Sequence, residues 1–306
     1  AIDIIIKDRV LEVKDVATIR EFKSQVNRNA KTYTANLLIE TTFGDLEKHR
    51  KGPFAVISAT DMAMGSRFDF TQERFDSMCL NLSDLRLARA VAASSAVPLV
   101  FSPITLNNHG GNCGYQLPEP VQAALQQAQS DEALSNLNRR EIGDTLARQY
   151  HNSKQRPYIH LLDGGLTDNL GLRNILETTE VLSNHLLYQR VRDERVRKIV
   201  IINVNAQTQA ITDIDKSAAV PGFADVANAI INIPIDKYSQ DSLRRFRVFV
   251  DEWNTKMQQA DGQPVKMYFI SLNLLDLPPS ALRDSVRGIP TSFYLPSHEV
   301  NDLKEA

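Results

Sequence analysis

An aspartate followed at once by two glycines is the feature of this sequence best suited to chemistry. Residues 160–172 read HLLDGGLTDNLGL, so an apolar run ends at Asp163, and Gly164 and Gly165 follow. Such a run predicts a buried strand that brings one carboxylate to its end before the chain turns sharply. A carboxylate in that position is costly unless its charge is used or hydrogen-bonded. On this segment alone, a plain Asp-Gly-Gly turn is an equally good interpretation.

The chain has two cysteines, Cys79 and Cys113. Neither belongs to a CxxC or Cys/His cluster, so we expect no metal site. A disulfide between them is one interpretation, and two separate buried thiols are the other. The choice depends on the distance between the two residues, which the sequence does not give.

Strands and helices alternate along the chain in an order that could position Asp163. Apolar and alternating runs predict the strands, and helical spacing predicts the segments between them. We therefore expect an α/β fold with a mostly parallel sheet flanked by helices on both faces. The predicted strands are 54–59, 67–70, 99–106, 158–162, 198–205 and 266–272, and the predicted helices include 14–40 and 85–96.

Two helical segments each leave two interpretations open. Residues 117–156 are rich in Gln, Ala, Asp, Glu, Asn and Arg, which indicates a helical insertion on the surface, either a lid over a site or a neutral insertion. A later stripe favours core packing, with a membrane-surface or partner-facing helix as the alternative. Its residues are Leu243, Phe246, Val250, Trp253 and Met257, at 3-4-3-4 spacing.

The composition argues against several classes of protein. The 306 residues carry a formal net charge of −2, which gives no electrostatic case for nucleic acid as a partner. No stretch approaches the roughly 20 apolar residues that span a bilayer, and the start shows no signal-peptide pattern. No GxGxxG or P-loop stands at a strand-to-helix junction, which disfavours a nucleotide-binding domain.

Three segments, in this order, resemble the patatin-like phospholipase family of serine acyl hydrolases. Residues 57–65 (ISATDMAMG) are similar to the family's strand ending in ATD, and residues 88–101 (ARAVAASSAVPLVF) to its ARAxxASxAxPxxF passage. Asp163-Gly164-Gly165, followed by Asp168-Asn169, is similar to its DGG motif and the DN after it. The resemblance covers about residues 42–205. It implies a three-layer α/β/α fold and one incomplete domain over residues 1–306.

The resemblance also implies a two-residue mechanism. A serine in a GxSxG turn attacks the ester carbonyl, and Asp163 accepts its proton with no histidine between them. This is coherent, because serine is a poor nucleophile until an adjacent base takes its proton. Gly164, Gly165, Asp168 and Asn169 support the motif, and neither a cofactor nor a metal is implied. We read His160, the histidine nearest to Asp163, as structural.

The chain departs from the family pattern at the nucleophile. No GxSxG occurs in the 306 residues, and the nearest approach, residues 64–68 (MGSRF), lacks the second glycine. Ser94 and Ser95 belong to the predicted small-residue helix and are not expected to be the nucleophile. We therefore expect the serine and the oxyanion loop to lie upstream of Ala1, the chain alone to be inactive, and an apolar face to be left exposed.

The sequence thus predicts a lipid acyl hydrolase that cleaves a phospholipid or related acyl lipid, or another acyl ester, at a membrane surface. A non-catalytic patatin-fold binding or scaffold protein is the alternative. Members with this kind of sequence suggest a location in the bacterial cell envelope, in the periplasm or at a membrane. The oligomeric state and the acyl-chain preference stay open.

Overall fold

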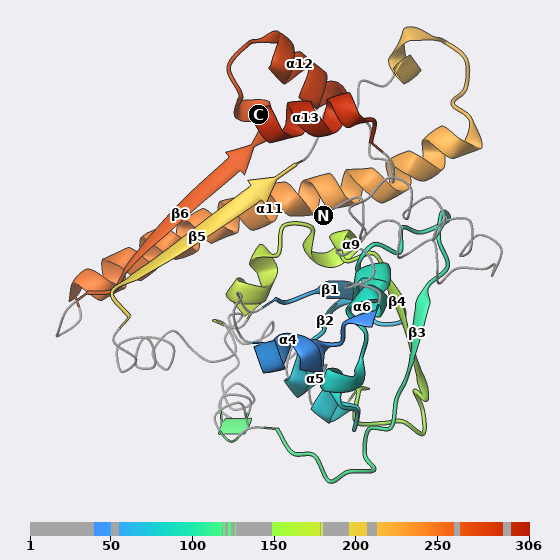
Figure 1. Ribbon diagram of the computed structural model, residues 1–306, viewed down its shortest axis with the longest axis vertical. Coiled ribbons are helices and arrows are strands. Elements are labelled where there is room, and N and C mark those ends of the chain that lie inside the picture. Colours follow the sequence, from blue (N-terminus) through green and yellow to red (C-terminus); the bar gives the residue numbers. More distant parts are fainter. Residues whose placement is uncertain are drawn as a thin grey trace. The chain divides into compact units, whose positions relative to one another are not determined.

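The computed structural model describes residues 40–49, 55–117, 149–177, 196–206, 213–259, 264–289 and 295–306, and the single positions 119, 122, 123, 126 and 179. The chain divides into two compact units, Ala1–Leu187 and Tyr188–Ala306 (Figure 1). The single domain expected over residues 1–306 stays a prediction. Residues 14–39 of the helix predicted at 14–40 lie outside the described residues, as does most of the insertion predicted at 117–156.

Both units combine helices and strands, so the mixed helix and strand content that we predicted is confirmed. The first unit contains α4 (Phe43–His49), β1 (Ser58–Asp61), β2 (Ser66–Asp69), α5 (Gln72–Ser77), η1 (Leu82–Asp84), α6 (Leu87–Ser94), β3 (Ile104–Asn107), β4 (Tyr158–Leu162) and α9 (Gly165–Asp168). The second contains β5 (Lys198–Asn205), η3 (Asp213–Lys216), α11 (Phe223–Gln259), β6 (Lys266–Asn273), η4 (Leu274–Asp276), α12 (Ala281–Gly288) and α13 (Ser297–Glu305).

The four-stranded sheet of the first unit has the order β2-β1-β4-β3, and every neighbouring pair is antiparallel. This differs from the mostly parallel sheet that we predicted. Only four residues connect β1 to β2, and a connection that short permits only an antiparallel pair. Gly65 takes a φ of +61° in this turn, and its N–H donates to the carbonyl of Asp61 at 2.8 Å.

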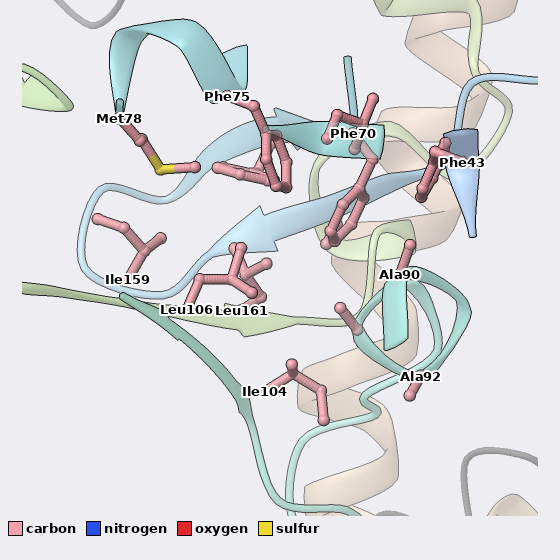
Figure 2. Packing of buried hydrophobic residues seen from close by; sticks show 14 of the residues in the cluster. Phe43, Phe70, Phe75, Met78, Ala90, Ala92, Ile104, Leu106, Ile159 and Leu161 are labelled. Carbon is pink, nitrogen blue, oxygen red and sulfur yellow. The ribbon is translucent and has the colours of Figure 1, made fainter. Parts of the chain in front are cut away.

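Aromatic and aliphatic side chains from the sheet, α4, α5 and α6 form the core of this unit (Figure 2). The rings of Phe68 and Phe70 meet edge to face with their centroids 5.3 Å apart, and Ile159 and Leu161 of β4 are fully buried beside them. The alanines of α6 let this helix pack against β1, β3 and β4. The close-packed helix predicted at 85–96 is therefore present.

The strand predicted at 99–106 begins only at Ile104. Before it, the N–H groups of Val100 and Phe101 both donate to the carbonyl of Val97, at 3.3 and 3.0 Å, and form a turn. Pro98 lies within this turn and Pro103 follows it, and proline has no N–H to offer a sheet ladder. The apolar composition of residues 99–103 led us to predict a strand, but the two prolines favour a turn at these positions.

In the second unit, β5 and β6 form a two-stranded parallel sheet with α11 along one face (Figure 1). Four residues of the stripe predicted on this helix are buried, so core packing is the interpretation that the structure supports. Trp253 also donates its indole N–H to the carbonyl of Val265 at 2.8 Å. The buried residues of the stripe are Phe246, Val250, Trp253 and Met257.

The opposite face of the same sheet is exposed and apolar. Parallel sheets are normally covered on both faces, so a face of this kind is unusual. Its side chains pair across the two strands in register, and we call them the β5–β6 apolar face: Val200 with Tyr268, Ile202 with Ile270, and Val204 with Leu272. Among the described residues, no helix is both long and apolar enough to cross a membrane.

Candidate functional site

Asp163 directly follows β4 and is half-buried. Its N–H donates to the carbonyl of Ala96 at 2.9 Å, and the N–H of Gly164 donates to the carbonyl of Ser94 at 2.9 Å. Both acceptors lie at the C-terminal end of α6. The strand end that carries the carboxylate is thus fixed to the C-terminal end of the small-residue helix.

The two glycines after Asp163 are required for different reasons. A Cβ on Gly164 would lie 2.4 Å from the carbonyl oxygen of Ser58 in β1, a contact with backbone that cannot move aside. A Cβ on Gly165 would lie 3.1 Å from Oδ1 of Asp163 and 3.0 Å from Oδ1 of Asn169. The N–H of Gly165 donates to Oδ1 of Asp163 at 2.8 Å and orients the carboxylate.

Thr60 of β1 supports the same turn, and its role was not predicted. Its hydroxyl donates to the main-chain carbonyl of Asp163 at 2.7 Å and lies 2.9 Å from the hydroxyl of Thr167. Thr60 is buried, so this hydroxyl forms the hydrogen bonds that a buried polar group needs. The ATD triplet was the available signal, because it places Thr60 beside the position where β4 ends.

Asp168 belongs to a buried network of charges centred on Arg67 of β2. The Arg67 guanidinium contacts the carboxylate of Asp69, lies 2.7 Å from Oε2 of Glu177, and has its Nε 3.9 Å from Oδ2 of Asp168. Burial raises the pKa of Asp168, while the N–H of Arg173 and the charge of Arg67 oppose that shift. Asp168 therefore fixes α9 to β2. Asn169, the other residue of the DN pair, is exposed.

A second buried carboxylate, Asp61 at the end of β1, has partners from the far end of the predicted insertion. Tyr150 donates its hydroxyl to Asp61 at 2.9 Å, and Arg156 lies 2.6 Å away. The N–H groups of Ala63 and Met64 also donate to it, at 3.0 and 3.2 Å. Tyr150 is fully buried, so the end of segment 117–156 packs in the core rather than on the surface. A buried carboxylate needs hydrogen-bond and charge partners, and this need explains why the end of the segment lies in the core and not on the surface as predicted.

Ser95, Ser66 and His160 are residues near the sequence motifs that could be compared with a nucleophile or its base. Ser95 donates its hydroxyl to the carbonyl of Val91, one turn back in α6, at 2.6 Å. Ser66 begins β2 and pairs with Asp61. His160 lies on the exposed side of β4, with Nδ1 2.9 Å from the hydroxyl of Thr105. The hydroxyl of Ser95 is thus engaged by the main chain of α6, while the hydroxyl of Ser66 is buried without a hydrogen-bond partner among the described residues.

Cys79 and Cys113 form a disulfide, the bonded one of the two interpretations that the sequence left open. The bond joins the end of α5 to the segment after β3. Cys79 has a φ of +53°, and its Sγ accepts the N–H of Cys113 at 3.1 Å. Elsewhere in the described ranges, no group of three or more His, Cys, Asp or Glu side chains is arranged to hold a metal ion.

A scan against protein-family models matches no family, and searches of curated proteins and of solved structures find no match either. The function of the site must therefore be argued from its own geometry.

Proposed function

We propose that this chain forms part of a lipid acyl hydrolase in which Asp163 is the base of a Ser-Asp dyad. The observation that carries the proposal is the placement of Asp163: half-buried at a strand end, with its main chain fixed by α6 and Thr60 and its carboxylate by Gly165. Each of these contacts comes from one of the three segments that resemble the patatin-like family.

A base that takes the proton of a serine must be held in one position before the substrate arrives. Asp163 meets this requirement, because its main-chain N–H, its main-chain carbonyl and Oδ1 each have a partner within 3.0 Å. The serine would come from a segment outside this sequence, on a turn that brings its hydroxyl within about 3 Å of the carboxylate. The proposal includes a three-layer α/β/α arrangement of the complete protein.

A non-catalytic binding or scaffold protein is the second candidate. The absence of GxSxG from the 306 residues favours it. In that case the buried contacts of Asp163 and Asp168 would serve stability alone. Substituting either residue would then change the unfolding of the protein and no reaction rate.

Turnover of a p-nitrophenyl ester by protein expressed from the whole reading frame tests the proposal. We expect the 306-residue chain to be inactive and the longer protein to lose turnover by a factor of 10² or more in Asp163→Asn, the upper range for loss of a general base being about 10⁴. Asp168→Asn is the matched control, since this carboxylate is buried in the Arg67 network. Turnover that survives in Asp163→Asn would refute the dyad.

A further inference from the structure

The turn between α6 and β3 carries two large apolar side chains in solvent close to Asp163. Leu99 is 75% exposed and Val100 is 62% exposed, although both lie within a segment that contributes to the core on either side. Leu99 also has a φ of +68°, a conformation that residues with a Cβ rarely adopt. Strain and exposure together at one position indicate a function for the turn.

The turn is fixed rather than loosely exposed. Val97 donates its N–H to the carbonyl of Ser95 at 2.9 Å, and the carbonyl of Val97 accepts from Val100 and Phe101. The backbone therefore holds Leu99 and Val100 outward in one arrangement. A rigid apolar surface of this kind loses little entropy when a ligand covers it.

The same turn lies a few residues along the chain from a residue that contacts the main chain of Asp163. Ala96 accepts the N–H of Asp163 at 2.9 Å, and Leu99 follows Ala96 by three residues. Three residues span at most about 11 Å between Cα atoms, even when fully extended. No Asp, Glu, Lys or Arg occurs between Ala90 and Asn108, so the turn itself carries no charged side chain.

We propose that Leu99 and Val100 form the contact surface for the acyl chain of the substrate. This inference rests on the proposed function, because it is Asp163 that makes a neighbouring apolar surface part of a substrate site. The ligand is a single fatty acyl chain, which buries its methylene groups against the two side chains while its ester lies toward Asp163. Each buried methylene adds to affinity, so longer chains should bind more tightly.

Photolabelling of the 306-residue chain with a diazirine derivative of dodecanoic acid tests the inference without requiring catalysis. We expect mass spectrometry to map the label to residues 97–101, and a butanoic acid probe to label at least about tenfold less. In the double variant Leu99→Ser, Val100→Ser, labelling should fall about tenfold or more. Met62→Ser is the matched control, because Met62 is 58% exposed but lies at the other end of β1, where its N–H donates to the carbonyl of His160.

Labelling elsewhere, or unchanged labelling in the double variant, would overturn the inference. A second combination of results would also overturn it: the double variant binds phosphatidylcholine vesicles more weakly than the wild type, and dodecanoate does not label the turn. The turn would then contact a bilayer. Both substituted residues are exposed, and far-UV circular dichroism checks that the fold is kept. If residues 97–101 are labelled in the wild type but turnover of the longer protein survives Asp163→Asn, the dyad alone would be refuted.

Discussion

The two adjacent glycines after Asp163 should respond very differently to the same added methyl group. In Gly164→Ala the new Cβ would lie 2.4 Å from the carbonyl oxygen of Ser58 and 3.0 Å from its carbon, both in the backbone of β1. Since neither atom can move without displacing the strand, we expect the upper range for overpacking, a loss of about 3 kcal/mol. For a unit of this size, that loss lowers the midpoint of thermal unfolding by about 6–12 °C.

In Gly165→Ala the nearest atoms are the side-chain oxygens of Asp163 and Asn169, at 3.1 and 3.0 Å. Side chains can rotate away by a few tenths of an ångström, so we expect a stability loss of only about 1 kcal/mol or less. The added methyl group should instead turn the Asp163 carboxylate away from its present orientation. In an active longer protein, Gly165→Ala should therefore reduce turnover more than it reduces stability.

Hydrogen exchange of peptides from β1 and β4 measures the first unit directly. Trp253, the only tryptophan, lies in the second unit, so its fluorescence is an internal reference that neither substitution should move. Gly288→Ala is the matched control, because no atom lies within 4 Å of its added Cβ. Equal protection in Gly164→Ala and Gly165→Ala, or no loss in Gly164→Ala, would refute the steric argument.

Three further predictions follow from the contacts described above. Cys113→Ser opens a loop closed over a separation of 34 residues, so it should cost the first unit about 3–4 kcal/mol in urea unfolding, and unchanged unfolding would show that the bond with Cys79 contributes nothing. Tyr150→Phe removes a hydrogen bond to the buried carboxylate of Asp61, at a cost of about 1.5–3 kcal/mol at pH 7. Burial raises the pKa of Tyr150, so the unfolded chain loses the phenol proton at a lower pH than the folded chain does. As the pH rises through about 10, the stability of the wild-type chain should therefore fall more steeply than that of Tyr150→Phe. Parallel curves of stability against pH would contradict this. Ile202→Thr in the β5–β6 apolar face should reduce dye binding and light scattering by the 306-residue chain, and no change would mean that the face is already covered.

The local elements around Asp163 could be predicted from the sequence, because each depends on a short pattern. The apolar run before Asp163 and the alanines of α6 indicate a strand and a close-packed helix, and both are present. The strand predicted at 99–106 was placed too early, because the apolar content of residues 99–103 was given more weight than Pro98 and Pro103.

The contacts that fix the carboxylates could not be predicted, because they join residues far apart in the chain. Thr60 and the carbonyl of Asp163 are separated by 103 positions, and Asp61 and Tyr150 by 89. The antiparallel pairings of β4 with β1 and β3 are of the same kind, whereas the β1–β2 pair depends on its short connection. Periodicity identifies a strand but not its neighbour, and for that reason the sheet was predicted with the wrong direction.

The rate at which a fluorophosphonate probe labels a serine in protein expressed from the whole reading frame tests the central claim most directly. If Asp163 accepts the proton of that serine, Asp163→Asn should slow labelling by a factor of 10² or more, toward about 10⁴, while Asp168→Asn labels at a rate close to that of the wild type. Labelling at the wild-type rate in Asp163→Asn would remove Asp163 from the mechanism and leave it a structural residue at the end of β4.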